Sequence, residues 1–122
     1  MQDILKRINN GFDGIIRNIG VVNFKQATIE VSCYNNKTKE WININFQFDN
    51  IKEINIFQKL NTSSQVLSDG INFGEIEGFY YLDFNPYLDL GSENTISDIR
   101  KSDVYIISEK IGYTIKNYSD FS

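Results

Sequence analysis

Apolar and polar residues alternate most regularly in two neighbouring segments of the chain, residues 27–34 and 41–48. The apolar positions are Ala27, Ile29, Val31 and Cys33 in the first segment and Ile42, Ile44, Phe46 and Phe48 in the second. Because successive side chains of a strand point to opposite faces, a period of two predicts strands that each bury one face. Residues 35–39 between them are polar and have the length of a hairpin turn. The two segments therefore predict an antiparallel hairpin.

Further strands are predicted on both sides of this hairpin. Residues 14–22 are apolar and β-branched, although two facing patterns compete within them, and residues 51–60 repeat the alternation. Residues 71–76 and 79–84 read as two strands around a turn at Glu77 and Gly78. Residues 104–107 and 111–115 read as a closing pair joined around Glu109 and Lys110. Strands with such short connections favour antiparallel pairing.

Helical signals are short. Ile4, Leu5 and Ile8 have helical spacing, and Gly11 supplies the left-handed conformation that closes a helix. Residues 62–65 have the spacing of a capping box, and residues 97–101 are a second candidate for one helical turn. The predicted fold class is α+β, predominantly antiparallel β: a meander or small sandwich with a short N-terminal helix and one or two helical turns.

Length and composition agree with one domain that spans residues 1–122. The apolar content of 41% and the aromatic content of 14% are enough for one hydrophobic core. The single cysteine cannot form an intramolecular disulfide, which favours a reducing compartment. The first residues do not form a signal peptide, and no apolar run approaches about 18 residues. We therefore expect a cytoplasmic protein with no membrane partner.

The residues that common enzymes need are largely missing. The chain has no histidine, which removes the commonest general base and metal ligand, and no glycine-rich phosphate loop. Cys33 lies on the apolar side of its strand and is expected to be a buried thiol. We predict a protein without enzymatic activity, cofactor or metal. The alternative that stays open is a hydrolase that uses two carboxylates, for which Glu75 and Glu77 are the candidate pair.

Charge is distributed unevenly along the chain. Residues 60–99 contain no lysine or arginine and seven acids: Asp69, Glu75, Glu77, Asp83, Asp89, Glu93 and Asp98. This stretch carries a net charge of −7 in a chain of net charge −4, so the remaining residues carry +3. Such an asymmetry predicts an acidic face that attracts a basic protein and disfavours nucleic acid.

Aromatic residues are interleaved with these acids. If Leu82 and Phe84 fill the core, alternation places Tyr81 and Asp83 together on the open face of the same strand. Tyrosine is favoured at protein interfaces, and surrounding acids steer a basic partner. The predicted partner-binding residues are Glu75, Glu77, Tyr81, Asp83 and Asp89, with Tyr81 as the anchor.

Three stretches of the chain resemble small bacterial immunity proteins of polymorphic-toxin and contact-dependent inhibition systems. They are residues 12–16, the alternating residues 41–46, and residues 48–51 at the start of the next strand. The resemblance implies a protein that has no enzymatic activity and that binds and blocks a cognate toxin domain. Related sequences often carry a histidine near the first strand, where this chain has Phe12. With the acidic face, the expected partner is a basic, nucleic-acid-directed toxin. A protein-interaction or adaptor domain without a toxin partner is the competing interpretation.

Overall fold

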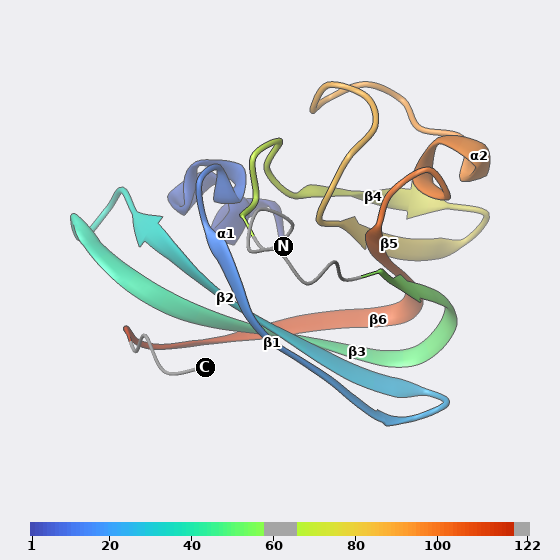
Figure 1. The fold of residues 1–122 in the computed structure, drawn as a ribbon, viewed down its shortest axis with the longest axis horizontal. Helices are drawn as coiled ribbons and strands as arrows, with labels where there is room; N and C mark the ends of the chain where they lie inside the picture. The colour runs from blue at the N-terminus through green and yellow to red at the C-terminus, as the bar shows by residue number, and fades with distance from the viewer. Residues whose placement is uncertain (58–65, 119–122) are drawn as a thin grey trace.

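The structure, a computed structural model, describes residues 1–57 and 66–118 and contains one six-stranded antiparallel sheet (Figure 1). The strand order is β1-β2-β3-β6-β5-β4. The elements are α1 (Gln2–Arg7), the 3-10 turn η1 (Asn9–Gly11), β1 (Ile15–Asn23), β2 (Gln26–Asn35), β3 (Glu40–Ile56), β4 (Asn72–Ile76), β5 (Phe79–Asp83), α2 (Ile96–Ile99) and β6 (Val104–Asn117). The predicted fold class, α+β with predominantly antiparallel strands and a short N-terminal helix, is confirmed.

The hairpin of β2 and β3 has the register that the alternation predicts. Ala27 pairs with Phe48, and Asn35 pairs with Glu40 across the turn. β3 is longer than expected, because it continues through Asn50 to Ile56 and includes the start of the predicted next strand. Asn50 has a left-handed φ of 54°, and the register with β6 shifts between Ile51 and Glu53. This irregularity bends the strand without ending it.

β6 contradicts the prediction of a closing strand pair. Residues 104–117 form one continuous strand, so no hairpin turn occurs at Glu109 and Lys110. Asp49 pairs with Lys110, and the side-chain amide of Asn50 donates a hydrogen bond to Glu109 at 3.1 Å. The polar pair therefore marks the bend that β6 shares with β3, where a short polar interruption looks like a turn in the sequence.

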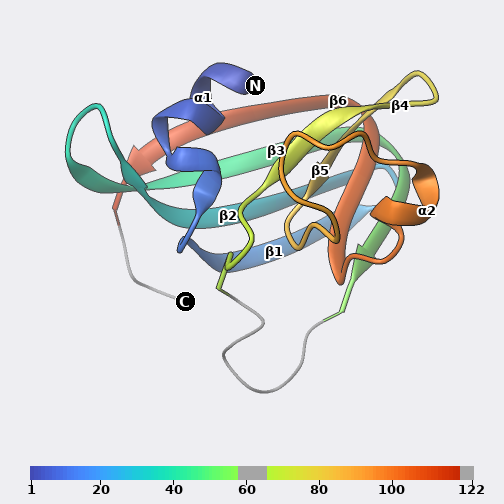
Figure 2. The ribbon, with the colours of Figure 1, turned by 90° about the horizontal axis from the view of Figure 1, so that it is seen from above.

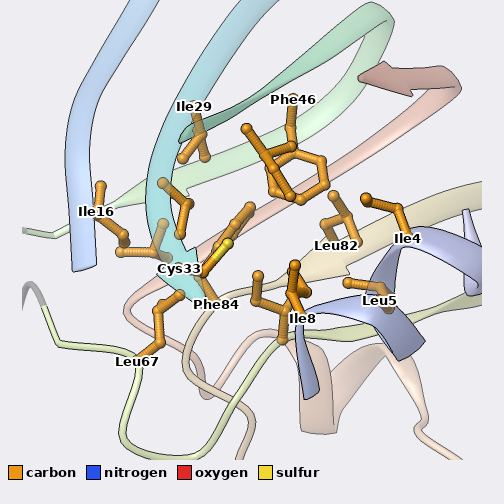
Figure 3. Packing of buried hydrophobic residues seen from close by; sticks show 14 of the residues in the cluster. Ile4, Leu5, Ile8, Ile16, Ile29, Cys33, Phe46, Leu67, Leu82 and Phe84 are labelled. Atoms are coloured by element: carbon orange, nitrogen blue, oxygen red, sulfur yellow. The ribbon is translucent and has the colours of Figure 1, made fainter. Parts of the chain in front are cut away.

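The main core fills the inner face of the curled sheet. The β4 and β5 end turns over the same core that β2 and β3 face, and α1 lies beside it (Figures 1 and 2). The rings of Phe46 from β3 and Phe84 after β5 meet edge to face at 5.9 Å. The predicted apolar positions of β2 and β3 all enter this core, together with Ile4, Leu5, Ile8, Leu67 and Leu82 (Figure 3).

Cys33 belongs to this core, as predicted, with no exposed surface. Burial raises the pKa of its thiol to about 12. Since the thiolate is the reactive form, the side chain behaves as a small apolar group.

A second, smaller core lies on the outer face of β5 and β6. It contains Tyr81, Ile99, Tyr105 and Ile107, with Ile76, Phe79 and Ile96 packed against it. The segment between β5 and β6, which carries α2, covers this face (Figure 2). α2 begins at a capping box of Thr95 and Asp98 and lies one residue earlier than the predicted turn at 97–101.

The predicted helical turn at 62–65 lies outside the described residues. Neither helix in the described part of the chain is long and apolar enough to cross a membrane.

Candidate functional site

Tyr81 and Asp83 are buried, so the prediction that they share an open face is wrong. Tyr81 is 4% exposed and Asp83 is 0% exposed. β5 is covered on both faces: Leu82 packs into the main core, and Tyr81 packs into the second core. Alternation correctly placed Tyr81 and Asp83 opposite to Leu82, but it carries no information about the segment that returns over them.

Both side chains have interior hydrogen-bond partners. The amide of Asn94 donates to the Tyr81 hydroxyl at 3.4 Å, and the backbone N–H of Asn85 donates to Asp83 Oδ1 at 3.0 Å. Burial raises the pKa of both Tyr81 and Asp83. Their contribution is to the packing of the β4 and β5 end, and they cannot be an anchor or an exposed charge for a partner.

The other three predicted residues, Glu75, Glu77 and Asp89, are exposed. Glu75 lies near the end of β4, and Glu77 occupies the turn to β5 with a φ of 50°. Gly78 follows with a φ of 83°, which gives the two left-handed residues typical of a tight hairpin turn. Asp89 lies in the segment after β5, so the structure does not bring these three acids together at one point.

Asp89 instead meets an acid from a different part of the chain. It lines a small notch of about 160 Å³ together with Asp69. The remaining lining residues are Phe12, Pro86, Tyr87, Leu88 and Leu90. Phe12 is 40% exposed and Tyr87 is 60% exposed, so two aromatic rings and two carboxylates border one hollow that is open to a partner.

Gly70 lets the segments that line the notch approach each other closely. Its φ is +78°, and a Cβ at this position would lie 3.1 Å from Leu90 and 3.2 Å from the ring of Phe12. The next residue, Ile71, donates its backbone N–H to the carbonyl of Asn10 at 2.7 Å. Glycine therefore lets the chain turn and lets Asp69 lie against the segment of Phe12.

Residues 60–99 contain no lysine or arginine, but in the folded protein cations from other segments lie beside them. Lys101 lies over the ring of Tyr87 at 4.1 Å, and Lys52 lies over the ring of Phe79 at 4.4 Å. Arg100 pairs with Glu53 at 2.8 Å. We define the acidic surface by four exposed acids of this stretch, Asp69, Glu75, Glu77 and Asp89.

Among the carboxylates of the described residues, Glu53 has the most strongly shifted pKa, and no pattern in the sequence pointed to it. Arg100 donates two hydrogen bonds to its two oxygens, at 2.8 and 3.0 Å, and the hydroxyl of Tyr105 donates a third. The hydrogen bonds from Arg100, with that from Tyr105, lower the pKa of Glu53 to about 2. This cluster fastens the end of α2 to β3 and holds the covering segment in place.

The outer face of the other half of the sheet carries a polar layer, defined as Arg17, Glu30, Ser32, Asn43 and Lys116. Arg17 donates to Ser32 at 3.0 Å, Ser32 donates to Asn43 at 2.6 Å, and Asn43 donates to Glu30 at 3.2 Å. Lys116 pairs with the second oxygen of Glu30 at 3.4 Å. Glu30, Ser32 and Asn43 are buried although they face away from the core.

Within residues 1–57 and 66–118, no three Cys, Asp or Glu side chains form a group that could hold a metal ion. Comparison with protein-family models, with curated proteins and with solved structures gives no match to this chain.

Proposed function

We propose that this chain is an immunity protein that binds and neutralises a basic bacterial toxin domain through its acidic surface. The observation that carries the proposal is the notch in which Asp69 and Asp89 lie beside the exposed rings of Phe12 and Tyr87. This arrangement replaces Tyr81 as the anchor and keeps Asp89, Glu75 and Glu77 as charge complements.

The notch suits the head of one basic side chain. A guanidinium or ammonium group between the two carboxylates gains charge-assisted hydrogen bonds, and an aromatic face adds a cation–π contact. Lys101 already lies over the ring of Tyr87 within the chain, at 4.1 Å, so the exposed ring of Phe12 is the aromatic face proposed for the partner's cation. A partner whose basic active-site groove supplies this side chain would have that groove covered by the bound domain.

Glu75 and Glu77 have a second role in this proposal. Both are exposed at the far end of β4 from Asp69 and act on the approach of the partner, not on the notch itself. Exposed charges of this kind change the association rate and its salt dependence more than they change the dissociation rate.

The test uses the protein encoded next to this chain as the candidate toxin, with association and dissociation rates measured at low and high salt. We expect Asp69→Lys with Asp89→Lys to weaken binding by about 100-fold or more, mainly through faster dissociation. The matched control is Glu75→Lys with Glu77→Lys, which changes charge equally at the other end of β4. It should slow association by about tenfold, mostly at low salt.

Unchanged affinity and unchanged salt dependence in both double variants would exclude the acidic surface as the binding site. Failure of the wild-type protein to bind or inhibit the neighbouring product would argue for the adaptor interpretation. The hydrolase interpretation requires two carboxylates in a concave pocket. Its candidate pair, Glu75 and Glu77, lies exposed at a hairpin turn and lines none of the cavities described for this structure.

A further inference from the structure

The turn between β1 and β2 presents an unusual apolar tip. Phe24 is 100% exposed, and Val21 and Val22 are 59% and 67% exposed. The register of β1 with β2 shifts between Val21 and Asn23, so Val22 is an extra residue that the ladder leaves out. The hairpin end projects at the lower right of Figure 1. We call Val21, Val22 and Phe24 the hairpin knob.

The knob is held in place by its own turn. The side chain of Asn23 accepts a hydrogen bond from the backbone N–H of Lys25 at 2.8 Å, and the carbonyl of Lys25 accepts one from the N–H of Ile51 at 3.1 Å. Gln26 donates to Asp49 at 3.0 Å. Because the turn is tied to β3, a partner that binds Phe24 meets an ordered element and incurs little ordering cost.

The largest cavity among those described is an open groove of about 680 Å³ that residues 109–111 of β6 border. Its apolar lining consists of Met1, Phe73, Tyr80 and Ile111, and its polar lining consists of Gln2, Asp3, Glu109 and Lys110. The rings of Phe73 and Tyr80 stack with their centroids 5.9 Å apart and form one wall. A flat aromatic wall of this size suits an inserted aromatic side chain.

We propose that the hairpin knob of one copy of this chain binds in the groove of a second copy. The charges are complementary at one point, because Lys25 beside Phe24 would meet the carboxylates of Asp3 and Glu109 in the groove. The apolar surfaces match as well, since the knob offers an exposed phenylalanine and the groove offers a stacked aromatic pair.

Knob and groove lie at the same end of the sheet, which favours a closed dimer. Gln26 next to the knob pairs with Asp49, and Asp49 pairs with Lys110 at the groove. The two features are therefore separated by about two strand spacings, roughly 10 Å. A two-fold axis between two copies lets each knob enter the groove of the other, so the contact forms twice in one dimer.

The first measurement is sedimentation velocity of the wild-type protein from about 1 to 500 μM, where we expect a reversible dimer. Phe24→Ser should weaken dimerisation by about 100-fold or more. The matched control is Phe57→Ser, which removes another phenylalanine that is 52% exposed. This control should dimerise like the wild type.

The second measurement mixes two variants that each fail to dimerise alone. Phe24→Ser keeps its groove, and Tyr80→Ser keeps its knob. The mixture should form a heterodimer through the one intact pair, detected by the anisotropy of a fluorescent label on one variant. Lys25→Glu mixed with Asp3→Lys repeats the test on charge alone and leaves the apolar groove untouched.

Three results would overturn the proposal: a wild-type protein that stays monomeric to about 500 μM, dimerisation that survives Phe24→Ser, or complementary variants that do not associate. Phe24-dependent binding of monomeric protein to vesicles of phosphatidylglycerol and phosphatidylcholine would assign the knob to a membrane surface instead. All variants at Asp69 and Asp89 should dimerise normally, which separates this inference from the toxin-binding proposal.

Discussion

The outer faces of the two halves of the sheet differ in the residues that they carry and in what covers them. Over β2 and β3, the outer face carries the polar layer, in which Glu30, Ser32 and Asn43 are buried by neighbouring side chains. Over β5 and the first part of β6, the outer face carries Tyr81, Tyr105 and Ile107, and the segment with α2 covers it. One half ends in a hydrogen-bonded polar surface, and the other has gained a second apolar layer.

This difference shows what alternation in a sequence does and does not determine. In β2 and β3 the residues between the apolar positions are mostly polar, and they face outward as expected. In β5, apolar and aromatic residues follow one another in Phe79, Tyr80, Tyr81 and Leu82. A strand that is apolar on both faces must be covered on both faces, so the run itself was the signal for a covering segment.

The largest expected effect comes from overpacking the half of the sheet that the α2 segment covers. A Cβ at Gly74 would lie 2.7 Å from the Tyr81 hydroxyl, so Gly74→Ala must displace a ring that is 4% exposed. We expect a loss of about 3 kcal/mol in the free energy of unfolding, measured by urea denaturation. In the open half, Gly112→Ala meets its nearest neighbour only at 3.9 Å and should be neutral or slightly stabilising. Equal effects of the two substitutions would contradict the comparison.

An intermediate effect is expected from breaking the polar layer. Asn43→Ala removes the acceptor of the Ser32 hydroxyl and a donor to Glu30 inside a buried group. The expected cost is about 2 kcal/mol, because buried polar atoms lose their partners. Asn45→Ala, at the next outward position of β3, is the control and should cost less than about 0.5 kcal/mol. If both variants unfold at the same urea concentration, the polar layer has no structural role.

The smallest effect is a dependence on pH at the cluster that fastens the covering segment. The pKa of Glu53 is lowered to about 2, so its contribution to stability is present above the ordinary value of 4.5 and is lost as the pH falls towards about 2. Glu53→Gln should therefore lower the melting temperature at neutral pH, and the difference from wild type should shrink below pH 4.5. Glu75→Gln, which neutralises an exposed strand position, is the control. A difference that grows on acidification would have the wrong sign.

Much of the fold follows from residues close in sequence. The β2 and β3 hairpin, the β4 and β5 hairpin with its turn at Glu77 and Gly78, and the presence of α1 were predictable from local patterns. The end of α1 was not, because the helix stops at Arg7 and Gly11 ends the 3-10 turn that follows it. The wrong predictions concern the positions at which β3 and β6 end. At Asn50 and at Glu109 a polar interruption suggested an end, but pairing between β3 and β6 keeps both strands extended. Long-range pairing overrides a local polar signal, and one sequence alone does not show it.

The site was predictable only in part, for a similar reason. The missing cations of residues 60–99 led to Asp89, Glu75 and Glu77 as candidates, and the structure shows these three residues exposed. Asp69 belongs to the same stretch, but it precedes β4 whereas Asp89 follows β5, and Phe12 precedes β1, so these residues meet only after folding. Lys52, Arg100 and Lys101 likewise reach this end from outside the stretch. The distribution of charge along the sequence therefore predicts the charge of the folded surface only in part.

The position of β6 has a consequence for how the protein is made. Ile42 pairs with Asn117 and Ile56 pairs with Val104, so the strand that joins the two halves is the last one in sequence. During synthesis the β1-β2-β3 unit and the β4-β5 hairpin emerge first, each with an open edge that only β6 closes. Ladders between distant segments form slowly, and unpaired edges invite aggregation. We therefore expect nascent chains that end before residue 104 to need a chaperone, whereas chains released beyond Asn117 fold in one cooperative step.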